Sequence, residues 1–162
     1  MSWDTRPFRL TQPECKPLNQ MNDQLVQLAK ATAQKHGLDP TLVCAICEQE
    51  SNWDPWAIRF EPRFMVRYVQ PLGLKSDTEI TARSISWGLM QLMGEGAREL
   101  GFKGQFLSEL CDPAVGLEWG CKHLINKFKA GGQDLHKTLL LWNGGGNPAY
   151  PDQVLARMTN YA

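Results

Sequence analysis

Helical periodicity, bounded by start and stop signals, covers most of this chain and restricts it to a mainly helical fold. Apolar residues recur at near-helical spacing over residues 18–36, and Gly37 follows, where helices commonly end in the left-handed conformation. Asp39-Pro40 then supplies an N-cap and a proline at the first helical position. These signals predict one amphipathic helix and a second one over residues 41–51.

The second half of the chain repeats these signals. Asp112-Pro113 opens another predicted helix, which has a buried apolar stripe and ends before Gly131. Residues 134–142 are almost wholly apolar and predict a central helix, and residues 152–161 predict a last amphipathic one. The fold class expected is mainly α, with at most a short β-hairpin.

Residues 52–83 lack sustained periodicity and read as an ordered insertion. Residues 78–81, Thr-Glu-Ile-Thr, are the one stretch here that predicts a strand. The aromatic residues Trp53, Trp56 and Phe60 are candidates for stacking on sugars, but aromatics in irregular segments more often anchor them. We expect at least two of these three in the core.

Length and composition fit one folded domain. The chain has 162 residues, of which 43% are hydrophobic, and this is enough to form a core without a metal or cross-links. We expect residues 18–162 to form this domain and residues 1–17, which contain three prolines, to form an N-terminal arm.

Charge and hydropathy exclude some classes of partner. The 17 basic and 17 acidic residues balance and are scattered, so the basic surface of a nucleic-acid-binding protein is not expected. The N-terminus lacks the apolar segment of a signal peptide, and no apolar run is long enough to predict a membrane span.

Cysteine and histidine spacing does not predict a metal site, and no cofactor is expected. Cys44 and Cys47 lie inside one predicted helix without a second such pair, which disfavours zinc. The three histidines are far apart and lack ligand spacing. We expect thiols throughout; the five cysteines are Cys15, Cys44, Cys47, Cys111 and Cys121.

Glu50 is an acidic residue on a predicted core face. At about 100° per residue, it projects between Val43 and Ile46, whereas Glu48 lies roughly 160° away around the helix. A buried carboxyl group is costly or has a raised pKa, which indicates a function. A wet helix end or an arginine partner would also explain it. Glu48 and Glu50 point in opposite directions, so they do not form a glycosidase carboxylate pair.

Three short motifs carry a resemblance to a known family. Residues 50–57 read Glu-Ser-Asn-Trp-Asp-Pro-Trp-Ala, residues 86–92 contain Gly-Leu-Met-Gln, and residues 142–145 read Trp-Asn-Gly-Gly. In this order, they resemble the motifs of soluble lytic transglycosylases and goose-type lysozymes over about residues 40–160. The resemblance implies a lysozyme-like fold with a substrate cleft. The insertion most resembles phage and prophage members.

The resemblance implies roles for residues in the first two motifs. Glu50 would be the catalytic acid/base, and Ser51 would bind a sugar acetamido group, or otherwise a free carbonyl at the helix end. Gly88 would let the backbone approach the sugar, and the amide of Gln91 would bind an N-acetyl group. Between them, Leu89 and Met90 belong to the substrate-binding motif, although Met90 also fits a core position.

The third motif departs from the family pattern. Asn143 would hold the substrate or the attacking group, or else simply cap a helix. The family has Tyr before this Asn, whereas this chain has Trp142, which can only donate from its indole N–H. Tyr150 is a candidate to supply the missing hydroxyl near Glu50, and the alternatives are Tyr161 or no replacement at all.

The implied activity is non-hydrolytic cleavage of peptidoglycan glycan strands at the β-1,4 bond after N-acetylmuramic acid, giving a 1,6-anhydro sugar. The alternative is hydrolysis by a muramidase, which needs a second acid, with Glu61 preferred over Asp77 and Glu79. A second alternative is an inactive glycan-binding subunit of a phage particle. We expect a monomer, made in the cytoplasm, that acts on the cell wall and is delivered there by another component. A phage or prophage gene is one expected source.

Overall fold

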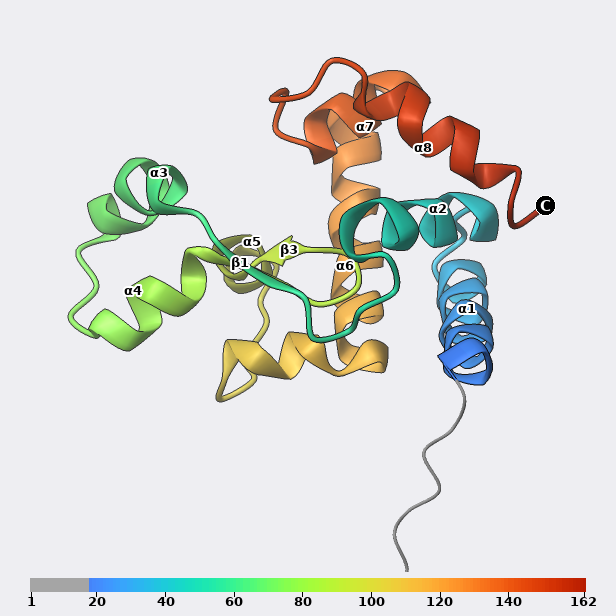
Figure 1. Ribbon diagram of the computed structural model, residues 1–162. Helices are drawn as coiled ribbons and strands as arrows, with labels where there is room; N and C mark the ends of the chain where they lie inside the picture. The colour runs from blue at the N-terminus through green and yellow to red at the C-terminus, as the bar shows by residue number, and fades with distance from the viewer. Residues whose placement is uncertain (1–17) are drawn as a thin grey trace, which may run out of the picture.

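Helices form the body of the protein in this computed structural model, which describes residues 18–162 (Figure 1). Helix α2 packs against both α1 and α8, while α6 packs against α1 and α7. Their contact surfaces form one core that includes Ile46, Leu117, Leu124, Leu139 and Val154. The helices of this body are α1 (Leu18–Lys35), α2 (Pro40–Ser51), α6 (Pro113–Ala130), α7 (Leu135–Trp142) and α8 (Tyr150–Met158). The mainly helical prediction is confirmed.

Helix α2 has the capping that its sequence predicts. The Asp39 carboxylate accepts a hydrogen bond from the backbone N–H of Thr41 at 2.8 Å, and Pro40 occupies the first turn. The helix ends where Asn52 adopts a left-handed conformation and its N–H bonds the carbonyl of Glu48. Glu50 is therefore placed in the last turn of α2.

A small antiparallel sheet lies beside the helical body. It consists of β1 (Ile58–Phe60), β2 (Ile85–Trp87) and β3 (Leu92–Met93), in that order, with β2 in the centre. Trp87 is opposite Ile58 on one side and Leu92 on the other. The sheet is thus one strand larger than the hairpin that the sequence predicts.

The strand predicted over residues 78–81 is wrong, because these residues belong to helix α4 (Asp77–Arg83). Ser76 caps the helix by accepting a hydrogen bond from the N–H of Glu79. Asp77 and Glu79 place acidic groups in the first turn, where the helix dipole favours negative charge. These local signals outweigh the β-propensity of the two threonines and the isoleucine.

Ion pairs attach the insertion to the neighbouring helix α5 (Gly94–Glu99). Glu79 accepts hydrogen bonds from Arg83 and Arg98, each at 2.9 Å, and Arg83 also donates to Glu95 at 3.0 Å. Between β1 and α4, the chain forms α3 (Pro62–Phe64), η1 (Met65–Val69) and η2 (Gln70–Leu72). In Figure 1 this segment projects to the left of the helical body.

A second, smaller core lies between the sheet, α5, α6 and η3 (Leu107–Cys111). Trp87 and Leu92 from the sheet contribute to it, together with Ala97, Phe102 and Leu110. The chain therefore folds around two apolar clusters, and the segments that carry the sequence motifs lie between them.

The aromatic residues after α2 divide differently from our expectation. Trp53 is buried and donates from its indole N–H to the Tyr161 hydroxyl at 2.8 Å. Trp56 and Phe60 are exposed, at 72% and 46%, so the prediction that at least two of the three are in the core is wrong. One hydrogen-bonded anchor is sufficient to hold this turn.

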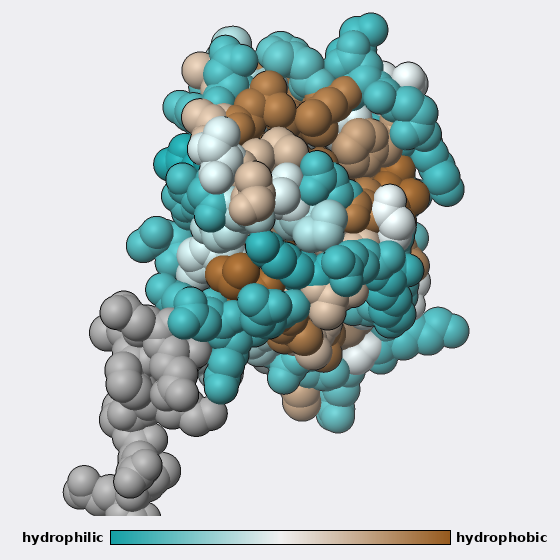
Figure 2. Space-filling view, turned by 90° about the vertical axis from the view of Figure 1, so that its right-hand side faces the viewer, coloured by the Kyte–Doolittle hydropathy of each residue, from teal (hydrophilic) through white to brown (hydrophobic). Residues whose placement is uncertain are grey.

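The four cysteines in the described part of the chain are buried free thiols, as predicted: Cys44, Cys47, Cys111 and Cys121. Cys15 and the predicted arm of residues 1–17 lie outside the described residues. The face formed by α1 and the end of α8 is mainly hydrophilic, with separate hydrophobic groups (Figure 2). Within residues 18–162, no helix is long and apolar enough to cross a membrane.

Gly88 connects β2 to the following turn at a point where two backbone segments touch. It has a φ of 67°, and a Cβ at this position would lie 2.4 Å from the backbone oxygen of Leu110. A glycine is thus required at this contact with η3. The expected approach of a sugar to its backbone stays a prediction.

Replacing Gly88 by Ala should lower the free energy of unfolding by about 2–5 kcal/mol, because left-handed strain and a backbone clash add together. Gly37→Ala is the matched control, since Gly37 has a φ of 68° but nothing within 4 Å of the added Cβ. It should cost only about 1 kcal/mol. Equal losses in chemical denaturation would contradict the role of the Leu110 contact.

Candidate active site

A cleft of about 470 Å³ lies between the insertion and the helices α6 and α7. Glu50 reaches it from the last turn of α2, and Trp142 and Asn143 reach it from the end of α7. The opposite side is lined by residues of the insertion, among them Arg59, Glu61, Phe64 and Tyr68, and by Ser86, Gln91 and Glu99. Residues distant in the sequence thus surround the Glu50 carboxyl group.

Two donors hold one oxygen of Glu50. The Tyr150 hydroxyl donates to Oε1 at 2.5 Å, and the Trp142 indole N–H donates to the same atom at 3.1 Å. Oε2 receives no hydrogen bond from a described residue. A protonated Glu50 would therefore carry its proton on Oε2, with Oε1 as the accepting oxygen.

Burial raises the pKa of Glu50 above its ordinary value. The hydrogen bonds from Tyr150 and Trp142 and the charge of Arg59 act in the opposite direction, but burial outweighs them. The same carboxyl group raises the pKa of Tyr150, after burial of the phenol itself, so the tyrosine stays a donor. A carboxylic acid held in this way suits general acid catalysis.

Glu48 lies on the other face of α2, as the helical spacing predicts. Its carboxylate accepts a hydrogen bond from Tyr161 at 2.6 Å and lies 3.5 Å from the guanidinium of Arg157. These partners belong to α8 and the C-terminal segment and do not line the cleft. Tyr161, the alternative to Tyr150 as a partner of Glu50, is therefore engaged elsewhere.

Ser51 joins the first motif to the second. Its Oγ lies 3.0 Å from the carbonyl oxygen of Cys47 and 2.9 Å from that of Leu89, and its one O–H hydrogen is shared between these two acceptors. The serine does not line the cleft. The position of Ser51 thus agrees with its alternative role as a partner of free carbonyls. It does not agree with the expected contact with a sugar acetamido group.

Gln91 lines the cleft, but its amide is used within the protein. The Nε2 group donates to the carbonyls of Ala57 and Gly88, both at 2.9 Å, and Oε1 accepts from Ser86 at 2.8 Å. Because both amide N–H groups are engaged, the expected recognition of an N-acetyl group is corrected. The side chain instead fixes the turn between β2 and β3.

Leu89 and Met90 are core residues, each 1% exposed. The side chain of Met90 packs where Gly120 of α6 leaves space for it. Their assignment to substrate binding is therefore corrected, because neither side chain reaches the cleft. Leu89 and Met90 therefore support the cleft from the core instead of lining it.

Asn143 forms the C-terminal cap of α7 and also lines the cleft. Its Oδ1 accepts a hydrogen bond from the N–H of Asn147 at 2.8 Å, which holds the following glycine-rich loop. Its Nδ2 makes no hydrogen bond with a described residue. The backbone N–H of Asn143 thus caps α7 by donating to the carbonyls of Leu139 and Leu141, and its side-chain oxygen holds the loop. The expected role in holding the substrate stays a prediction, for which the Nδ2 N–H groups are available in the cleft.

Of the three candidates for a second acid, Glu61 alone lines the cleft. It is paired with Arg59, whose Nε lies 2.5 Å from Oε1. Glu79 is held by two arginines, and Asp77 lies in the first turn of α4. Sequence reasoning missed Glu95 and Glu99, which also line the cleft; Glu95 is buried against Arg83.

His123 and Lys127 of α6 also line the cleft and were not anticipated. They are one helical turn apart, and this i, i+4 spacing could have predicted that both side chains lie on the same face of α6. The His123 ring packs edge-on against Trp142, with centroids 5.5 Å apart, and burial lowers its pKa to about 4. His123 is therefore a neutral support for the indole that bonds Glu50.

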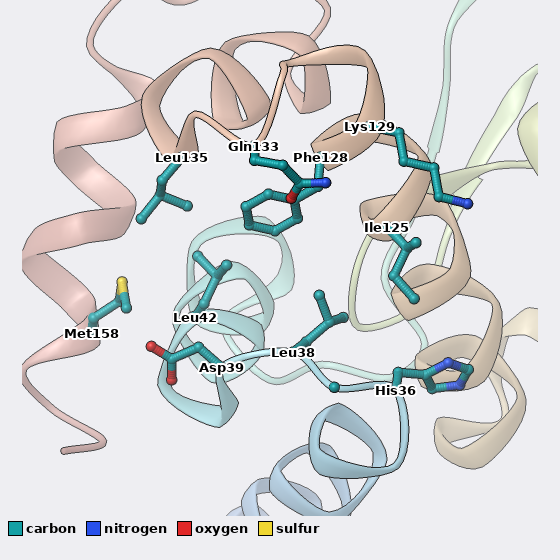
Figure 3. Close-up of a pocket in the computed structure, with 11 residues that line it drawn as sticks. His36, Leu38, Asp39, Leu42, Ile125, Phe128, Lys129, Gln133, Leu135 and Met158 are labelled. Atoms are coloured by element: carbon teal, nitrogen blue, oxygen red, sulfur yellow. The ribbon is translucent and has the colours of Figure 1, made fainter.

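A second hollow, of about 350 Å³, lies on the opposite side of α2 and α6 (Figure 3). It is lined mainly by apolar side chains such as Leu38, Leu42 and Phe128. Asp39, the one acid among its lining residues, caps α2. Among residues 18–162, no group of His, Cys, Asp or Glu is arranged to hold a metal ion.

Comparison with known proteins agrees with the position of these motifs. The family described as "Transglycosylase SLT domain" matches residues 27–153, which include Glu50, the segment from Gly88 to Gln91, and Tyr150. No curated protein and no solved structure matches the chain. Because the family match spans well over half of the sequence, the protein belongs to the SLT transglycosylase family and is an enzyme of lytic transglycosylase type that acts on peptidoglycan.

Proposed function

We propose that the protein cleaves peptidoglycan glycan strands between N-acetylmuramic acid and N-acetylglucosamine and leaves a 1,6-anhydromuramic end, with Glu50 as its acid and base. The observation that carries this proposal is one partly buried carboxyl group, Glu50, whose Oε1 is fixed by Tyr150 and Trp142. Oε2 is left for proton transfer. The other cleft acids with defined contacts are paired with arginines.

In the first step, Oε2–H of Glu50 protonates the glycosidic oxygen, and the bond from this oxygen to C1 of the muramic acid breaks. The raised pKa keeps a larger protonated fraction near neutral pH than an exposed glutamate would have. The acetamido oxygen of the muramic acid stabilises the positive charge at C1. Asn143, with free amide N–H groups in the cleft, is suited to hold this group.

In the second step, the Glu50 carboxylate accepts the proton of the C6 hydroxyl while O6 bonds to C1. This closes the 1,6-anhydro ring and returns Glu50 to its acid form. While the carboxylate exists, its charge is stabilised by the hydrogen bonds from Tyr150 and Trp142. One protein carboxyl group is sufficient for both steps.

Hydrolysis is the competing function, and Glu61 is the observation in its favour, because it lines the same cleft as Glu50. An inverting hydrolase would use such a carboxylate to activate water. The ion pair with Arg59 opposes this role, since it engages a carboxylate oxygen that would have to bind the attacking water.

Glu50→Gln should abolish release of muropeptides from purified cell walls, with a loss of roughly 10²-fold or more. Its amide oxygen can still accept from Tyr150 and Trp142, so the fold should remain intact. Since the pKa of Glu50 is raised by folding, its ionisation costs stability as the pH rises. The variant should therefore be as stable as wild type at low pH and at least as stable at neutral pH.

Glu48→Gln is the matched control, because Glu48 lies on the opposite face of the same helix. It should retain wall cleavage. Activity of Glu50→Gln within tenfold of wild type would contradict the assignment of the catalytic acid.

Tyr150→Phe tests whether the Tyr150 hydroxyl takes the role of the hydroxyl of the family tyrosine. Losing this hydrogen bond removes a stabiliser of the carboxylate, so the pKa of Glu50 should rise further. The alkaline limb of the pH–rate profile should move to higher pH, and kcat should fall by about 10- to 100-fold because the carboxyl group is less well positioned. An unchanged limb would show that Tyr150 does not act on Glu50.

Mass spectrometry of the soluble products separates the two functions. We expect anhydro ends and only a modest loss of rate, under about tenfold, for Glu61→Gln. Reducing ends together with a loss of about 10²–10⁴-fold for Glu61→Gln would establish a hydrolase and identify its second acid.

A further inference from the structure

Lys127 is a half-buried cation in the catalytic cleft that the mechanism above does not use. It lies in the last turn of α6, one turn after His123, and lines the cleft together with Leu141 and Gly144. Burial lowers its pKa, and the charge of Glu99 only partly offsets this effect. The site thus maintains a positive charge in a partly desolvated position.

Of the two arginine or lysine residues that line the cleft, Lys127 differs from Arg59 in having no ion pair with a described residue. Arg59, which also lines the cleft, is paired with Glu61, and Arg83 beyond it is paired with Glu79 and Glu95. Lys127 forms no ion pair with any residue in the described part of the chain. The charge of Glu99 acts on Lys127 without a direct ion pair, so the ammonium N–H groups are available to an anionic group of a ligand.

Helix capping alone does not explain the position of Lys127. A lysine near the end of α6 interacts favourably with the helix dipole, and Lys129 provides the same interaction in the same turn. The two residues lie about 160° apart around the helix. Lys127 faces the catalytic cleft, whereas Lys129 lines the second hollow, where Figure 3 labels it.

We propose that Lys127 binds a carboxylate on the muramic acid side of the substrate and makes the enzyme selective for anionic glycan strands over neutral ones. This inference rests on the proposed function for its substrate class. Two carboxylates have the required chemistry, the lactyl group of a bare muramic acid and the free carboxylates of an attached peptide. A neutral polymer of N-acetylglucosamine has neither.

Binding is measured first in the Glu50→Gln background, so that it does not depend on turnover. The probes are insoluble cell walls and the same walls after their carboxylates are converted to amides. Lys127→Met should weaken binding to native walls by roughly 10- to 100-fold, the value of a hydrogen bond to a charged group. It should leave binding to the amidated walls unchanged, and Lys127→Arg should restore most of the affinity.

Lys129→Met is the matched control, because it removes the same helix-end charge outside the cleft. It should bind both wall preparations like its parent. Equal weakening by the two methionine variants, or equal weakening on native and amidated walls, would overturn the role of Lys127. Thermal melting of each variant checks that the fold is kept.

A third wall preparation, treated with an amidase that removes the peptides, identifies the source of the carboxylate. Amidase cleavage of the lactyl amide removes the peptide and frees one lactyl carboxylate on each muramic acid. A defect of Lys127→Met that disappears on these walls assigns the peptide carboxylates as the group bound, and a defect that persists shows that Lys127 binds the freed lactyl carboxylate. With Glu50 restored, native walls that are bound in a carboxylate-dependent way but not cleaved would overturn the proposed function alone. Loss of carboxylate dependence with cleavage retained would overturn this inference alone.

Discussion

Burial of one carboxyl group at the end of α2 determines how the rest of the site is built. Removing Glu50 from water is unfavourable unless donors meet its oxygens or the group stays protonated, and the protein uses both solutions. Tyr150 and Trp142 supply the donors from α8 and from the end of α7. The packing of α8 against α2, and of α7 against α8, therefore positions the Glu50 carboxyl group as well as filling the core.

The family motifs serve mainly to hold this arrangement together. Ser51 bonds the carbonyl of Leu89, Gln91 closes the turn that contains Gly88, and Gly88 touches the backbone of η3. These contacts link the helix that carries Glu50 to the sheet and to the second core. Ser51 and Gly88, whose motifs suggested contact with the sugar, thus do not line the cleft. They hold in place the segments that form it.

The sequence was sufficient to predict the five helices of the body and the helix face on which Glu50 lies, because both depend on local patterns. Capping by Asp39 and the 100° helical step place Glu50 and Glu48 on opposite faces without knowledge of the tertiary structure. The partners of Glu50 depend on how distant helices pack, so Tyr150 was one of two candidates and His123 and Lys127 were missed. The strand expected at residues 78–81 failed because Ser76 and the acidic first turn of α4 favour a helix.

The replacement of the family tyrosine by Trp142 follows from the same need to satisfy Glu50. An indole N–H can only donate, so it can stabilise the carboxylate but cannot pass a proton onward. Tyr150 contributes the second donor to the same oxygen, and its raised pKa keeps it protonated while Glu50 changes its charge. With both donors on Oε1, proton transfer is confined to Oε2. A site with one transferring oxygen favours a mechanism in which the same carboxyl group gives a proton to the leaving oxygen and then accepts one from the attacking hydroxyl.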